Sequence, residues 1–409
     1  MTNLPFSKLI DIADFANPEL LPFLQEISRG EMNRFGLTEP LIIPDSKQWE
    51  CAMMLRVLSE CGTLRPGALI AGIGAGTEET TFALAARGCV VFPTDRYLEV
   101  TPWSDVAPAA MMVRPEQYTQ LEHDPRNVIP VHTDARALSL PSDFFDAVYS
   151  AGSIEHFGSL EAVRAAAEEI GRVLKPGGVA VLSTEFRLEG PNDKPWFDDN
   201  CILFTPELIR ENIVEPSGLE WLGAPDFAVS KDTFDSRVVL LDFLDKAKNV
   251  KTIEDKRNCY PNLILFHEGY LFCSVHIALK KPENVATRTG VHSAPFRAPV
   301  KQDSVKASAV LTEQIREWTA QFRAPPVNEA SVSELKERIS SLEAEWHRLS
   351  DLVRHADERV AIHERSRSFR LTRPMRDLAR LGRQNRIIRA VGSLVLRAFR
   401  RVKRALTQQ

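Results

Sequence analysis

A glycine-rich turn between an apolar segment and a helical segment constrains the fold of this chain more than any other feature. The turn is AGIGAGT at residues 71–77. Glycine at every second position lets the backbone bend sharply and approach a ligand closely, and the start of the next helix offers free N–H groups. A dinucleotide-binding fingerprint would need another glycine at position 77, which is threonine. A plain tight strand–helix turn is the alternative interpretation.

Short apolar segments alternate with helical segments around this turn. Such alternation predicts a mostly parallel sheet with helices on both faces. Residues 262–279 read as two strands around His267-Glu268-Gly269, which predicts a hairpin with antiparallel pairing at the sheet edge. The five earlier strands are expected at GALIAGIG (67–74), CVVFPTD (89–95), VIPVHTD (128–134), FFDAVYSAG (144–152) and GVAVLSTEF (178–186).

Composition and cysteine usage argue against several classes of protein. The 409 residues are 44% apolar and 26% charged, which suits two or three globular units better than a disordered or fibrous chain. No run reaches the roughly 18 apolar residues of a membrane span, and the first residues lack the pattern of a secretory signal. Six cysteines lie far apart without a metal-binding spacing, so reduced thiols in a cytoplasmic protein are expected.

The charge is distributed unevenly, because residues 365–409 hold fourteen Lys and Arg residues and one acid. A helical apolar face from Ile388 to Leu406 runs through this basic tail. Such a helix suits the surface of an anionic membrane. A nucleic-acid-binding or merely solvated arm is the alternative, although only Phe369 and Phe399 could stack on bases, which makes nucleic acid unlikely.

A heptad pattern precedes the basic tail. Apolar residues recur at alternating three- and four-residue steps from Val332 to His363, with β-branched residues at one core position. This pattern predicts a parallel coiled-coil homodimer, and a single amphipathic helix docked on the body is the alternative. The expected units are an N-terminal helical cap (1–60), an α/β domain (61–280), a linker (281–330), the coiled coil (331–363) and the basic amphipathic tail (364–409).

Polar residues follow the expected strands at their carboxyl ends, where open α/β sheets bind ligands. Asp95 lies about twenty residues beyond the glycine turn, where a carboxylate can accept two hydrogen bonds from a ribose diol. Asp134 could accept from an adenine amine, with the Ala135 N–H facing a ring nitrogen. Each acid alone could instead cap a helix or turn, but their ordered succession favours ligand binding.

The segments GIGAGT, TDRY, HTDA, FDAVYS, SIEHFG and RVLKPGG together resemble the class I S-adenosylmethionine-dependent methyltransferases over about residues 67–186. The resemblance implies a Rossmann-like, seven-stranded, mostly parallel sheet with a reversed last strand, and S-adenosyl-L-methionine as cofactor. It also implies roles for single residues: Gly72, Gly74 and Gly76 would hold the methionine part of the cofactor, Asp95 the ribose and Asp134 the adenine amine, and Ser150 would lie near the sulfonium.

One position departs from the family pattern. Many members carry an acid two residues before the first glycine of the turn, where this chain has Ile70. Glu78, directly after the turn, could contact the amino group of the cofactor instead. Alternatively, Glu78 is a first-turn acid that the dipole of the following helix favours.

Methyl transfer to a hydroxyl requires positioning, exclusion of water and removal of a proton. His156, at the exit of the fourth strand, is the first candidate for the base, and Glu155 could orient it or bind hydroxyls of the acceptor. A histidine that caps the next helix is the alternative. Asp198-Asp199-Asn200 could suggest metal ligands, but an exposed acidic loop explains this segment better, so no metal is expected.

A narrower resemblance concerns the substrate. The helix of Trp49, GAGTE (74–78), TDRY followed by Trp103, and SIEHFG are similar to methyltransferases of bacterial surface-polysaccharide biosynthesis. The segment SRSFRLTRPMR (366–376) resembles the tails of bacterial glycan-assembly proteins. These resemblances imply O-methylation of a sugar in a surface polysaccharide or lipid-linked glycan, at the inner face of the cell membrane. Other hypotheses are a small-metabolite or nucleotide-sugar methyltransferase, an RNA methyltransferase and a non-catalytic assembly scaffold.

Overall fold

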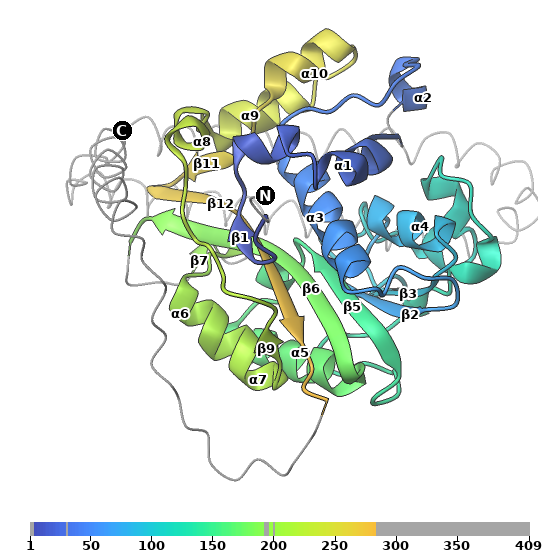
Figure 1. Cartoon of the computed structure of the whole chain (residues 1–409). Coiled ribbons are helices and arrows are strands. Elements are labelled where there is room, and N and C mark those ends of the chain that lie inside the picture. The colour runs from blue at the N-terminus through green and yellow to red at the C-terminus, as the bar shows by residue number, and fades with distance from the viewer. Residues whose placement is uncertain (1–3, 30–31, 192–195, 199–200, 284–409) are drawn as a thin grey trace, which may run out of the picture. The chain divides into compact units, whose positions relative to one another are not determined.

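The computed structural model describes residues 4–29, 32–191, 196–198 and 201–283, which Figure 1 draws as coloured ribbons. These residues lie within the first of the two units of the chain, Met1–Gln321. The predicted coiled coil and basic tail lie outside the described residues, as does the predicted linker from residue 284 onward.

A ten-stranded mixed sheet forms the centre of this unit. Its main path is β10 (Val238–Val239), β11 (Ile264–His267), β12 (Tyr270–Lys280), β6 (Leu174–Glu189), β5 (Phe145–Ala151), β2 (Leu69–Ile73), β3 (Val90–Asp95) and β4 (Val131–His132), while β1 (Lys8–Leu9) and β9 (Glu220–Trp221) pair with β12. The pairs from β4 through β6 are parallel, and β12 is antiparallel to both β6 and β11.

The predicted parallel series and the reversed last strand are confirmed. The hairpin turns at Glu268 and Gly269, whose φ angles of 49° and 86° suit a two-residue turn, and His267 pairs with Tyr270. The sheet has ten strands and not the expected seven, because three two-residue strands (β1, β9 and β10) join it. The antiparallel hairpin lies at the predicted end of the parallel series, and only the two-residue β10 pairs beyond β11. Strand β12 lies inside the sheet, and all but the last of its residues are buried.

Helices cover both faces of the sheet (Figure 1). The helices on one face are α1 (Leu21–Ser28), α3 (Ser46–Glu60) and α4 (Glu79–Ala86), and those on the other are α5 (Leu160–Val173), α6 (Pro206–Ile209) and α7 (Glu215–Ser217). The remaining helices are α2 (Met32–Phe35), α8 (Lys231–Asp235), α9 (Leu240–Ala247) and α10 (Ile253–Cys259), and a small separate sheet joins β7 (Trp196–Asp198) to β8 (Cys201–Ile202).

Helix α3 is the best-buried helix on its face of the sheet, although it carries charged side chains. Trp49 donates a hydrogen bond from Nε1 to Asp14 (2.8 Å), and Asp14 also pairs with Lys8 (2.5 Å). Arg56 is 1% exposed and donates to the Leu4 carbonyl. These bonds compensate the lost hydration of the buried groups, so they fix the N-terminal segment against α3.

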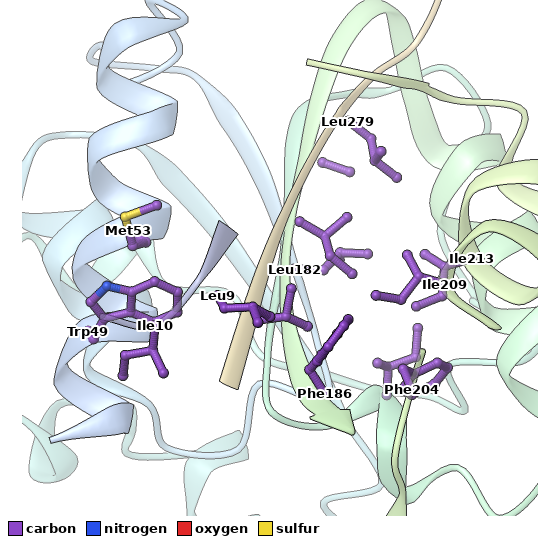
Figure 2. Close-up of a cluster of buried hydrophobic side chains, with 14 of the residues drawn as sticks. Leu9, Ile10, Trp49, Met53, Leu182, Phe186, Phe204, Ile209, Ile213 and Leu279 are labelled. Atoms are coloured by element: carbon purple, nitrogen blue, oxygen red, sulfur yellow. The ribbon is translucent and has the colours of Figure 1, made fainter. Parts of the chain in front are cut away.

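Apolar side chains fill the space on both sides of β12. Figure 2 shows Trp49 and Met53 of α3 on one side, and Leu182 and Leu279 on the other side, toward Ile209 of α6. All five side chains are fully buried. The N-terminal segment and residues 201–219 therefore share one continuous core with the parallel strands.

No helix within the described part of the chain is long and apolar enough to cross a membrane. Five of the six cysteines are buried, Cys61 is partly exposed, and none of them forms a disulfide. Burial raises the pKa of the Cys51 and Cys273 thiols, which keeps them protonated and unreactive.

Replacement of Gly171 by alanine tests the packing of α5 on α7. A Cβ at Gly171 would lie 1.9 Å from the Ser217 carbonyl oxygen, so one helix must move. We expect Gly171→Ala to lower the free energy of unfolding by about 1–3 kcal/mol, although alanine favours helices by about 1 kcal/mol over glycine. Urea unfolding followed by circular dichroism measures this. The exposed Glu168→Ala on the same helix should stay within about 0.5 kcal/mol, and equal stability of Gly171→Ala would contradict the packing argument.

Candidate functional site

The glycine turn lies at the carboxyl ends of the parallel strands, between β2 and α4. Gly74 and Gly76 adopt φ angles of 60° and 47°, which side chains disfavour. All three glycines are also crowded by other segments: a Cβ would lie 2.4 Å from the ring of Tyr149 at Gly72, 2.5 Å from the Ser153 hydroxyl at Gly74, and 2.6 Å from the Val106 carbonyl at Gly76. Contacts within the chain therefore already require glycine at these positions.

Asp95 lies beside the turn, at the end of β3. Its Oδ2 accepts a hydrogen bond from the Gly76 N–H (3.0 Å), and its Oδ1 accepts from the Arg96 N–H (2.7 Å). Tyr97 donates from its hydroxyl to the Gly76 carbonyl (2.8 Å). Burial raises the pKa of Asp95. The structure thus places this carboxylate against the backbone of the turn, and a backbone N–H group holds each of its two oxygens.

Asp134 follows β4, next to the strand of Asp95. Its carboxylate accepts from the Arg136 guanidinium, at 2.9 Å from Nε to Oδ1 and 2.5 Å from Nη2 to Oδ2. Arg136 holds the pKa of Asp134 well below its usual range, at about 2. Ala135 is partly buried against the main core. An adenine amine would therefore share the carboxylate of Asp134 with Arg136.

Ser150 is fully buried near the end of β5. Its hydroxyl lies 2.9 Å from the Ile73 carbonyl and 2.7 Å from the Ser153 hydroxyl, which itself donates to Ile73. The side chain of Ser150 thus joins the ends of β5 and β2. The Ser150 hydroxyl is therefore already hydrogen-bonded within the chain.

Glu78 lies at the N-terminus of α4, but its side chain makes no capping hydrogen bond. Its Oε1 lies 3.6 Å from the Lys47 ammonium, and its Oε2 is buried without a hydrogen-bond partner among the described residues. Lys47 also donates to Glu50 (2.7 Å) and to the Ala151 carbonyl (3.1 Å). The Glu78 side chain therefore does not cap the helix, and its Oε2 is shielded from solvent. It faces the ammonium of Lys47 on α3.

Glu155 lies in the short helix Ile154–His156, which follows β5 directly. Its side chain is 3% exposed, and its Oε2 accepts from the Thr184 hydroxyl (2.9 Å). Burial raises the pKa of Glu155, and it also raises the pKa of Glu185 on β6, with Glu155 and Glu50 adding to that effect. Several acids thus share a water-poor region beside the glycine turn, with Lys47 as the nearby cation.

His156 lies between this acidic region and the solvent. Its Nε2 is 4.0 Å from Glu155 Oε1, and its side chain is 24% exposed. Trp103, from the segment after β3, lies against the imidazole with ring centroids 4.3 Å apart. The Glu155 carboxylate, the His156 imidazole and the Trp103 indole therefore lie next to one another. Exposure to solvent increases from the buried carboxylate to the half-exposed indole.

Among the described residues, no group of three or more His, Cys, Asp and Glu side chains is placed to hold a metal ion. Asp199 and Asn200 lie outside the described residues.

The structure groups the predicted site residues in two places. Asp95 and Gly76 are in direct contact. Glu155 and Lys47 lie beside Gly152, Glu78 faces Lys47, and His156 lies next to Glu155. Sequence reasoning missed three participants: Lys47, Glu50 and Ser153. Lys47 and Glu50 form an i,i+3 pair on a helix that is otherwise mostly apolar toward the sheet, and that pattern could have drawn attention to them.

Known proteins match part of this chain. The family model for the methyltransferase domain matches residues 71–182, and no curated protein matches the chain. Two similar solved structures are phosphoethanolamine N-methyltransferase 2 from Haemonchus contortus in complex with S-adenosyl-L-methionine (16% identity over 56% of this chain and 52% of that chain, TM-score 0.38) and an S-adenosylmethionine-dependent methyltransferase from Mesorhizobium loti (15% identity over 55% and 96%, TM-score 0.34).

The matched residues contain the glycine turn, Asp95, Ser150 and the pair of Glu155 and His156. The chain therefore carries a methyltransferase domain and is a methyltransferase.

Proposed function

We propose that this enzyme methylates a hydroxyl group of a sugar in a bacterial surface polysaccharide or its lipid-linked precursor. The observation that carries the proposal is the arrangement of Glu155, His156 and Trp103 at the exit of β5. An imidazole beside a buried carboxylate is suited to act as a general base, and a half-exposed indole offers an amphipathic surface to a sugar ring.

The residues around the glycine turn fit the methyl donor. Glu78 offers a buried carboxylate oxygen that has no partner in the described part of the chain, and backbone N–H groups orient the carboxylate of Asp95 beside the turn. In the proposed complex, Asp95 binds the ribose hydroxyls, Asp134 and the Ala135 N–H bind the adenine, and the backbone from Gly72 to Gly76 binds the methionine part. When bound, S-adenosylmethionine supplies a methyl group on a positively charged sulfur.

The protein residues act on the acceptor hydroxyl. Because Glu155 Oε1 faces His156 Nε2, an Nε2–H would point toward the carboxylate and leave Nδ1 to take the hydroxyl proton. The Thr184 hydroxyl fixes the other oxygen of Glu155, so the carboxylate is held in place to stabilise the imidazolium that forms. Catalytic hydrogen bonds are often long in unliganded enzymes and tighten with substrate, which is consistent with the 4.0 Å separation.

An apolar, exposed segment beside the site supports a lipid-linked acceptor. Exposed clusters of large apolar side chains are typical of interaction sites. The segment after Asp95 carries such side chains on both sides of Trp103: Leu98, Val100, Val106 and Val113.

The proposal also covers the other parts of the chain. We propose that residues 187–280 and the N-terminal cap form the acceptor region, that residues 331–363 form a coiled-coil homodimer, and that the basic tail at 364–409 binds the anionic inner face of the cell membrane. The heptad pattern and the concentration of positive charge support these assignments.

The methyl acceptor can be found by transfer of labelled methyl from S-adenosylmethionine to a fractionated bacterial lysate. We expect label in the lipid-linked glycan fraction with the full-length enzyme. Asp95→Ala should abolish it, because the ribose loses its carboxylate partner. Label only in the soluble sugar-nucleotide or RNA fraction would leave the enzyme class in place and contradict the proposed acceptor.

The His156→Gln variant tests the base. Loss of general-base catalysis should lower kcat by about 10²–10⁴-fold, while the affinity for S-adenosylmethionine stays unchanged, since the imidazole is not assigned to the donor. Steady-state kinetics on the labelled glycan fraction and calorimetric donor binding measure the two effects. His123→Gln is the matched control, because His123 lies in a different loop, where its ring contacts the Leu121 carbonyl and Phe82. A kcat of His156→Gln within threefold of wild type would rule out the assignment.

A chain that ends after residue 330 tests membrane binding. We expect the full-length protein to sediment with phosphatidylglycerol vesicles and the shortened protein to remain in the supernatant, because the positive charge and the apolar face lie in the removed tail. Neutral phosphatidylcholine vesicles serve as the control, and donor binding should be equal in both proteins. Sedimentation of the shortened protein with anionic vesicles would contradict the docking role of the tail.

A further inference from the structure

We propose that Lys47 and Glu78 together bind the amino-acid end of the methyl donor, Lys47 through the α-carboxylate and Glu78 through the α-ammonium. The inference goes beyond the proposed function and does not depend on which acceptor is methylated. It assigns a binding role to Lys47 and gives Glu78 a defined partner in the ligand.

The position of the Lys47 ammonium is the first support. Nζ lies 3.1 Å from the Ala151 carbonyl at the end of β5, and a Cβ on Gly152 would come within 2.6 Å of it. The first turn of α3 thus delivers a cation to the strand end that borders the glycine turn. The side chain is 51% exposed, so a ligand can reach it without displacing the core.

The second support is the set of charges around this ammonium. Glu50 Oε2 accepts from Lys47 (2.7 Å), and its Oε1 accepts from the Ser274 hydroxyl (2.6 Å). Glu50 is therefore fixed by the sheet and holds the lysine in position. Glu78 also faces the lysine, with its Oε1 at 3.6 Å and its Oε2 buried without a partner among the described residues.

An α-amino acid matches this arrangement because it carries an ammonium next to a carboxylate. Placed beside this pair, its carboxylate would face the Lys47 ammonium and its ammonium would face Oε2 of Glu78. The Ala151 carbonyl is a further acceptor for the ammonium. Ile70 is fully buried in the core, so it offers no polar atom to this end of the ligand, and Glu78 supplies the anion that this chain lacks at position 70.

The test compares two ligands of the full-length protein by titration calorimetry. S-adenosylhomocysteine has the amino-acid end, and 5′-methylthioadenosine has the same adenosine and thioether without it. We expect Lys47→Met and Glu78→Gln to weaken S-adenosylhomocysteine by about 10–100-fold, the range for one charge-assisted hydrogen bond, and to leave methylthioadenosine within threefold. Lys47→Arg should restore most of the affinity.

Proton release provides a second readout. Burial raises the pKa of Glu78 to about 8, against the effect of nearby Lys47 and with support from Glu50 and Glu155. At pH 7 the carboxyl is therefore mostly protonated, and an arriving ammonium should lower its pKa and expel a proton. The binding enthalpy of S-adenosylhomocysteine should then depend on the ionisation enthalpy of the buffer in the wild type and lose this dependence in Glu78→Gln.

Lys231→Met is the matched control, because Lys231 also forms an ion pair with an acid on its own helix, Asp235, but lies on α8. It should leave both affinities unchanged. Equal losses for both ligands in Lys47→Met would show a general disturbance of the site, and unchanged affinities would place Lys47 outside it; either result overturns the inference. Since no acceptor is present, failure of the glycan proposal leaves this test intact.

Discussion

Close contact between the glycine turn and three neighbouring segments sets the position of every other group at the strand ends. Tyr149, Ser153 and Val106 each approach one glycine so closely that no side chain fits. Because interiors are close-packed and resist small changes in volume, the turn is held from the sheet, from the exit of β5 and from the segment after β3. The same three segments carry Ser150, Glu155 and Trp103, so one set of contacts positions the residues proposed to bind the donor and the acceptor.

Burial of charge is the second organising factor. Glu50, Glu78 and Glu155 lie near one ammonium, and removal of so many carboxylates from water is unfavourable unless cations or donors compensate them. Lys47 compensates them only in part, since one oxygen of Glu78 stays without a partner among the described residues. A cationic ligand would complete the compensation, which fits a donor that carries both a sulfonium and an ammonium.

The sequence predicted the local features of the fold and the site well. Alternating apolar segments indicated the parallel strands, and their carboxyl ends indicated the location of Asp95 and Glu155, because these features depend on neighbouring residues in the chain. The short strands β1, β9 and β10 were missed, since their pairing joins segments that are distant in the chain. Lys47 was missed for the same reason: its helix looks amphipathic in isolation, and only tertiary packing brings its first turn to the end of β5. The engagement of Asp134 by Arg136 is a local contact that composition alone does not distinguish from a free carboxylate.

The interior position of β12 also bears on the order in which the chain can assemble. Residues 270–280 (β12) lie between β6 and β11. Strand β11 can therefore join the parallel strands only after β12, the last strand in chain order, has paired with β6. Strand β1 pairs with the same strand, at Lys8 with His276. The strand that holds Lys8 thus completes its pairing only with the last strand of the sheet in chain order. Such long-range pairing slows folding, because the entropy of closing a long loop opposes it before the contacts form.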